Sequence, residues 1–182
     1  MTSTIRAAAP APSGDFDVDA LFRTLDDERS ARGLTWPQLA REIGAPFKGL
    51  PSRPIATSTL RGMRERRAIE GDGVLQVLRW LKQTPERFVP GDRDGRPEPA
   101  PLPDVGAYQI LRFDTRRIYA LLDARRSERA IPWTQVAREV GGINAAGLTR
   151  FASGGRTAFP QVIRIARWLQ VPVASLTRGF NW

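Results

Sequence analysis

Arginine is the residue best equipped to do chemistry in this sequence of 182 residues. Lysine and arginine number 28 against 19 acidic residues, for a net charge of +9, and only Lys48 and Lys82 are lysines. Guanidinium groups form paired hydrogen bonds with phosphate and with guanine, although a GC-rich genome produces the same arginine bias. The charge favours a polyanionic partner, nucleic acid before a membrane surface.

The sequence also excludes several kinds of chemistry. It contains no cysteine and no histidine, which removes disulfides, zinc fingers, thiol nucleophiles and histidine-based catalysis. Asp26, Asp27 and Glu28 are adjacent on an expected helix, but nothing pairs them with a base or a metal. We therefore predict a protein that is not an enzyme and that uses no cofactor and no metal.

One group of arginines is unusually dense. Arg61, Arg64, Arg66 and Arg67 fall within seven residues, directly after the start of an expected helix. A run of charge is often no more than a solvated surface. The density of this one, beside a helix that is a candidate for reading DNA, favours phosphate binding instead.

The clearest local structure lies at positions 133–154. Apolar residues at i, i+3, i+4 and i+7 from Trp133 predict a short helix, and Gly141-Gly142 then permits a tight turn. Asn144 can cap a second short helix. Two short helices joined by a glycine turn, the second with small polar and basic residues outward, describe a helix-turn-helix, whose second helix lies in the major groove of DNA.

This pattern occurs twice. LDDERSARGLTWPQLAREIG at 25–44 matches LDARRSERAIPWTQVAREVG at 122–141, at an offset of 97 residues. In the later part of each copy the offset is 88, so that VLQVLRWL at 74–81 matches VIRIARWL at 162–169. The difference of nine residues falls in the loop at 45–57, where a chain tolerates added length. We infer an internal duplication.

The duplication predicts an all-α protein with two domains. We expect a flexible tail at 1–15, a first domain at 16–90 and a second domain at 112–182. Between them, the proline-rich segment 91–111 is expected to be a stiff, extended linker. Each domain is small but within the size range that folds alone.

In the first copy, apolar spacing predicts a helix over 17–32, a second helix capped by Thr35 and a third that begins at 57–58. Trp36, like Trp133 in the second copy, opens the second helix. Its ring either lies over a sugar-phosphate strand or completes the apolar stripe. We favour the core, because a large aromatic side chain at helical spacing usually packs.

Each copy resembles the phage-repressor-like (Cro-like, XRE) helix-turn-helix family. The resemblance covers 16–90 and 112–178, and it rests on LTWPQLAREIG in the first copy and on IPWTQVAREVG, AGLTRFASGGR and VIRIARWLQVPVASL in the second. It implies two tandem five-helix, lambda-repressor-like domains, each of which binds DNA through its third helix.

The resemblance also implies which residues contact DNA. In the second copy they are Asn144, Ala145, Ala146, Thr149, Arg150, Arg156 and Gln135. In the first copy they are Thr57, Ser58, Arg61 and Gly62, together with Gln38. The density of the arginine run, and not the resemblance, adds Arg64, Arg66 and Arg67 as expected phosphate contacts. Arg150 can pair with guanine, Asn144 with adenine or a phosphate, and the two glutamines would lie near phosphates. The long loop at 45–57 displaces or re-aims the third helix of the first copy.

The expected function is that of a sequence-specific, double-stranded DNA-binding transcriptional regulator. We expect it to be cytoplasmic and associated with the bacterial nucleoid, with DNA, a homodimer mate or a regulatory protein as partners and no membrane. The alternative is a protein-interaction regulator of the antitoxin or antiactivator type, in which one repeat binds a protein. In that case Phe47, Leu50 and Ile55 would offer an apolar contact.

Overall fold

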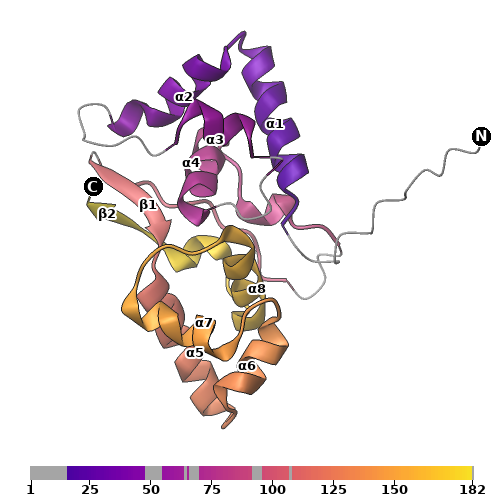
Figure 1. Ribbon diagram of the computed structural model, residues 1–182, viewed down its shortest axis with the longest axis vertical. Coiled ribbons are helices and arrows are strands. Elements are labelled where there is room, and N and C mark those ends of the chain that lie inside the picture. Colours follow the sequence, from indigo (N-terminus) through magenta and orange to yellow (C-terminus); the bar gives the residue numbers. More distant parts are fainter. Residues whose placement is uncertain are drawn as a thin grey trace, which may run out of the picture.

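The computed structural model describes residues 16–47, 55–63, 65, 70–91, 96–106 and 108–181, and within them the chain is mostly helical (Figure 1). The first repeat (16–90) contains α1 (Val18–Ala31), α2 (Trp36–Gly44), η1 (Ala45–Phe47), α3 (Thr57–Arg61), α4 (Gly71–Leu81) and η2 (Pro85–Phe88), where η marks a 3-10 turn. The second repeat (112–181) contains α5 (Thr115–Glu128), α6 (Trp133–Val140), α7 (Ala145–Arg150), η3 (Phe151–Ser153), α8 (Phe159–Leu169) and η4 (Val173–Leu176). Two strands, β1 (Gln109–Phe113) and β2 (Thr177–Asn181), form an antiparallel pair. The tail predicted at 1–15 lies outside the described residues.

Short polar side chains begin the helices where the sequence predicts them. The Asp17 carboxylate accepts a hydrogen bond at 2.8 Å from the amide three residues later and caps α1. Its counterpart Asp114 accepts one at 3.0 Å and caps α5. Thr35 and Gln38 form a reciprocal capping box at the start of α2. The helix starts predicted at 17 and 35 are therefore confirmed.

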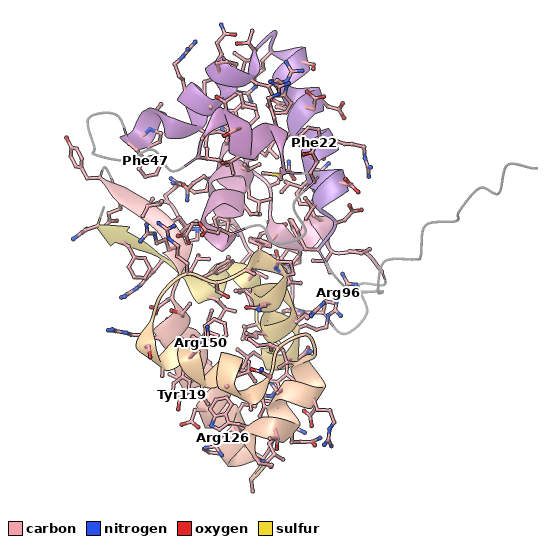
Figure 2. The ribbon with its side chains drawn as sticks, in the orientation of Figure 1. Phe22, Phe47, Arg96, Tyr119, Arg126 and Arg150 are labelled. Carbon is pink, nitrogen blue, oxygen red and sulfur yellow. The ribbon has the colours of Figure 1, made fainter. Side chains whose placement is uncertain are left out.

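The duplication extends to contacts around the tryptophans. The Arg29 guanidinium lies 4.9 Å from the centre of the Trp36 ring, and its counterpart Arg126 lies 5.3 Å from that of Trp133 (Figure 2). The Trp36 ring also stacks on Phe22, with 5.5 Å between ring centres. Both tryptophans are half-buried and pack against the hydrophobic core. Their interpretation as part of the core is confirmed.

The two repeats share one hydrophobic core. Phe159, at the start of α8, is fully buried, and its ring centre lies 4.5 Å from that of Phe16 in the first repeat and 5.5 Å from that of Phe113 in β1. At the same junction the Gly71 amide donates to the Thr157 carbonyl at 2.9 Å. Apolar surface of both repeats is therefore buried together, so the two repeats pack directly against each other.

Equivalent elements meet across a near two-fold axis. α4 contacts α8 and η2 contacts η4, and both pairs are related by the offset of 88 residues. Glu70 and Ala158, which are also equivalent, form an antiparallel bridge. In Figure 1, a half-turn in the plane of the picture carries α1, α2 and α3 toward α5, α6 and α7.

The sheet departs from the all-α prediction. β1 pairs with β2, with Gln109 opposite Asn181, and begins within the segment predicted as linker. Leu111 in β1 is buried, and its carbonyl accepts a hydrogen bond from Gln76 Nε2 of α4 at 3.0 Å. Leu102, earlier in the same segment, packs against the core. Contacts with the first repeat determine that β1 forms a strand. A local alternation of apolar and polar residues does not.

Candidate nucleic-acid interface

α6 and α7 form the helix-turn-helix of the second repeat. The turn contains Gly141 and Gly142 at φ values of 73° and 68°, a region that other residues rarely adopt. Asn144 Oδ1 then accepts a hydrogen bond from the Gly147 amide at 2.7 Å and begins α7. The fully buried Leu148 holds α7 against the core. The predicted turn and helix cap are confirmed.

The predicted contact residues of α7 are exposed to different degrees. Arg150 (Figure 2) and Ala146 are exposed, whereas Ala145 and Thr149 are half-buried. The Thr149 hydroxyl donates to the Ala146 carbonyl at 3.2 Å. Asn144 is exposed, but its oxygen serves as the helix cap, so a base contact would use its NH₂ group. Ala146 and Arg150 are therefore the exposed contact residues within α7 itself.

A polar hollow of about 330 Å³ lies beside α7. Its lining includes Asn144 and Arg150, Arg156 and Thr157 of the following loop, and Gln161 of α8. The Thr157 hydroxyl donates to Gln161 Oε1 at 3.2 Å, so guanidinium and amide groups are the donors around this space that suit a phosphate group. The sequence gives no signal for Thr157 and Gln161, because only the fold brings their segment beside α7.

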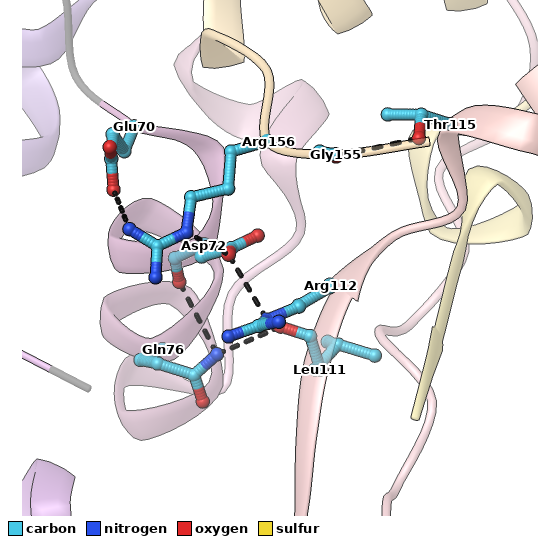
Figure 3. A network of polar contacts seen from close by, with 8 residues as sticks. All are labelled: Glu70, Asp72, Gln76, Leu111, Arg112, Thr115, Gly155 and Arg156. Atoms are coloured by element: carbon cyan, nitrogen blue, oxygen red, sulfur yellow. Dashed lines mark hydrogen bonds and ion pairs between the residues drawn. The ribbon is translucent and has the colours of Figure 1, made fainter. Parts of the chain in front are cut away.

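Arg156 connects the hollow to the first repeat (Figure 3). Its guanidinium lies 3.3 Å from the Glu70 carboxylate and 3.9 Å from that of Asp72. Arg112 of β1 approaches the same Asp72 oxygen at 3.2 Å. Burial raises the pKa of Asp72, and the nearby Arg112 and Arg156 oppose that shift. To contact DNA as predicted, the Arg156 guanidinium must either bind a phosphate while it stays paired with Glu70 or break its ion pair with Glu70.

The two glutamines expected near phosphates are engaged within their own repeats. Gln135 Nε2 donates to Glu139 at 3.0 Å, and Gln135 Oε1 accepts from Arg138 at 2.9 Å. Gln38 Oε1 accepts from the Thr35 amide at 2.7 Å. These hydrogen bonds stabilise α6 and the start of α2. To contact a phosphate, each glutamine would have to exchange these hydrogen bonds for one to the phosphate.

The first repeat has a shorter third helix. α3 spans five residues, and its N-cap Ala56 supplies no side-chain hydrogen bond. Ser58 and Arg61 are exposed, and Thr57 is half-buried. The structure thus brings three of the predicted contact residues together on α3. The basic residues expected after them lie outside the described residues: Arg64, Arg66 and Arg67.

The apolar loop residues of the first repeat do not form a contact surface. Phe47 and Ile55 are each only 4% exposed. The expectation that they would offer an apolar contact to a partner is therefore wrong, because the fold buries them where a loop position suggested exposure. Leu50 lies outside the described residues.

A second polar cluster joins α5, α6 and α8. The Glu139 carboxylate accepts hydrogen bonds from Arg129 at 2.5 Å, from Trp168 Nε1 at 2.8 Å and from Gln135 at 3.0 Å. These donors, with Arg129 the strongest, lower the pKa of Glu139 from 4.5 to about 2. The carboxylate therefore stays ionised in mildly acidic solution.

Replacement Glu139→Gln is expected to make folding less sensitive to acid. Because the pKa of Glu139 is lower in the folded chain, ionised Glu139 adds stability above about pH 4.5, and this is lost as the pH falls toward about 2. Urea unfolding between about pH 7 and about pH 3 should show a smaller loss of stability for the variant. The cluster is exposed, so about 1 M salt should shrink the difference. Equal pH slopes at low salt would contradict this assignment.

The described residues contain neither a membrane span nor a metal-binding group. No helix there is long and apolar enough to cross a bilayer, and no group of three or more acidic side chains is placed to hold a metal ion. Comparison of the chain with family models, with curated proteins and with solved structures finds no match. The function proposed below is therefore argued from the geometry and the charge of the site.

Proposed function

We propose that this chain is a sequence-specific, double-stranded DNA-binding transcriptional regulator that reads the major groove with the third helix of one or both repeats. The observation that carries the proposal is α7, a capped helix after a glycine turn, with Ala146 and Arg150 exposed beside a polar hollow. A guanidinium there can pair with guanine O6 and N7, and a methyl group can meet that of thymine. The likeness of the second repeat to phage-repressor-like proteins supports the same assignment.

The near two-fold arrangement supports the binding of one chain to two half-sites. Helix-turn-helix dimers reach two half-sites about one helical turn, roughly 34 Å, apart. Two repeats in one chain supply the equivalent of such a dimer, and the packing around Phe159 fixes their spacing. Because the repeats differ in sequence, the proposed site is an imperfect palindrome.

Charge ranks the second repeat as the main contributor to affinity. Residues 113–182 carry 11 basic and 4 acidic side chains, whereas residues 17–90 carry 13 and 10. Contacts between cations and phosphates release counterions and supply most of the sequence-independent affinity. The larger surplus of the second repeat therefore favours it as the stronger binder. The proposal involves no enzymatic step and no cofactor.

Selection of bound duplexes from a random pool tests the proposal. We expect enrichment of a site that the full chain binds about 10³-fold or more tightly than unrelated duplex at the same salt concentration. Uniform affinity for all duplexes would reject sequence-specific regulation. Failure to bind any duplex at about 50 mM salt would reject DNA binding altogether.

Arg66→Ala tests the basic run of the first repeat. If this residue contacts a phosphate, the variant should bind all duplexes more weakly by the same factor. The slope of log K against log salt concentration should fall by about one unit. Arg23→Ala, an exposed position on α1, is the matched control and should leave the slope unchanged. A loss confined to one DNA sequence would contradict a phosphate contact.

A further inference from the structure

The duplication creates two equivalent grooves, and the chain's own linker forms part of the wall of the first. This first groove lies between α2 and α4, has a volume of about 570 Å³, and is lined on one side by Pro101, Leu102 and Asp104. Leu102 packs against the hydrophobic core. Burial lowers the pKa of Arg79, and the nearby Asp104 carboxylate partly offsets this shift. Leu102 thus anchors the segment to the core, and two residues later Asp104 lines the same groove as Arg79.

The second groove is the counterpart of the first in the other repeat. Six of its lining residues correspond to residues of the first groove, among them Glu139 to Glu42, Arg167 to Arg79 and Trp168 to Trp80. In both grooves the indole N–H donates to the glutamate, at 2.8 Å in the second and 3.0 Å in the first. Within the described part of the chain, the second groove has a volume of about 350 Å³ and no linker residue lines it.

The second groove is also the more basic. Arg125, Arg129, Arg164 and Arg167 line it, where two basic residues line the first groove. Its one carboxylate, Glu139, already accepts hydrogen bonds from Arg129 and from the indole. A surface with this surplus of positive charge attracts an acidic ligand and disfavours a basic one.

We propose that the second groove binds an extended acidic segment of a protein partner. An apolar side chain of that segment would lie against Val140 and Trp168, and a carboxylate two residues later would face Arg167, as Leu102 and Asp104 do in the first groove. Proline-rich segments suit this role, because they are already extended and lose little entropy on binding. Arginines also attract DNA, but an extended, proline-rich segment already packs along the equivalent groove, which favours a peptide here.

A peptide with the sequence of residues 97–105, PEPAPLPDV, tests the proposal on the full chain in the absence of DNA. Fluorescence anisotropy of the labelled peptide should show saturable binding, and Arg167→Glu should weaken it by at least about tenfold. Arg117→Glu reverses the same charge at an exposed position outside the groove and should change the affinity by less than about twofold. A peptide carrying Leu102→Ser and Asp104→Lys should not bind.

Three results would overturn the proposal. The first is no saturable binding to the wild-type chain. The second is binding that survives Arg167→Glu but is lost in Arg79→Glu, which would assign the peptide to the first groove. The third is a loss of duplex affinity in Arg167→Glu without any peptide binding, which would make the groove a nucleic-acid surface. The variant Arg167→Lys keeps the positive charge and should therefore still bind the peptide. Thermal unfolding of each variant shows whether it is folded. Since the peptide assay contains no DNA, it does not depend on the proposed function.

Discussion

Phe159→Ala is expected to destabilise the whole chain by about 3–5 kcal/mol, the largest effect of any single change considered for this protein. The ring is fully buried between Phe16 of the first repeat and Phe113 of β1, so its removal leaves a cavity in the core that both repeats share. Both repeats should therefore lose stability together. Urea unfolding, followed by tryptophan fluorescence and by circular dichroism, measures the change in the free energy of unfolding.

A control separates the shared core from a general effect of losing an aromatic ring. Tyr108 is 66% exposed, and Tyr108→Ala should change stability by no more than about 0.5 kcal/mol. The wild-type chain should unfold in one transition by both probes. Two separate transitions, with only the second repeat affected by Phe159→Ala, would contradict a shared core.

Arg150→Ala is expected to weaken binding to the selected duplex by about 1–3 kcal/mol, or roughly 5–150-fold. In the proposed complex the exposed guanidinium at the end of α7 pairs with a guanine edge, so its loss should also relax the preference at one base pair. Titration of the selected duplex and of single-base variants measures both effects.

The matched control for Arg150 is Arg178→Ala, an equally charged and exposed position on β2. It should leave the preference at every base pair unchanged. If Arg150→Ala weakened all duplexes by the same factor, Arg150 would contact phosphate and not a base, and the reading surface would have to be reassigned.

Local features of the fold can be predicted from the sequence, because short-range chemistry fixes them. Asn144 as a helix cap and Gly141-Gly142 as a turn act within four residues of their own positions. The apolar spacing that begins at Trp133 likewise reports on one helix face. These features are enough to define the helix-turn-helix before any tertiary contact is known.

Contacts between the repeats cannot be predicted in this way. Gly71 and Phe159 occupy equivalent positions in the two repeats, and both lie against the ring of Phe113. A Cβ on Gly71 would lie 2.6 Å from that ring, so the position has no room for a larger residue. An internal alignment shows that the two residues differ but not that they pack side by side. The pairing of Arg156 with Glu70, 86 positions apart, is hidden for the same reason.

Hydroxyl-radical footprinting of the full chain on its selected duplex tests the central claim most directly. With one chain bound per duplex, we expect protection on one face of the DNA over two segments about one helical turn apart. The protection should be stronger at the DNA segment that α7 contacts than at the other segment. In Arg150→Ala, the loss of protection should be largest at the segment that α7 contacts. A strictly symmetric footprint that requires two chains, or protection that Arg150→Ala leaves unchanged, would contradict the claim.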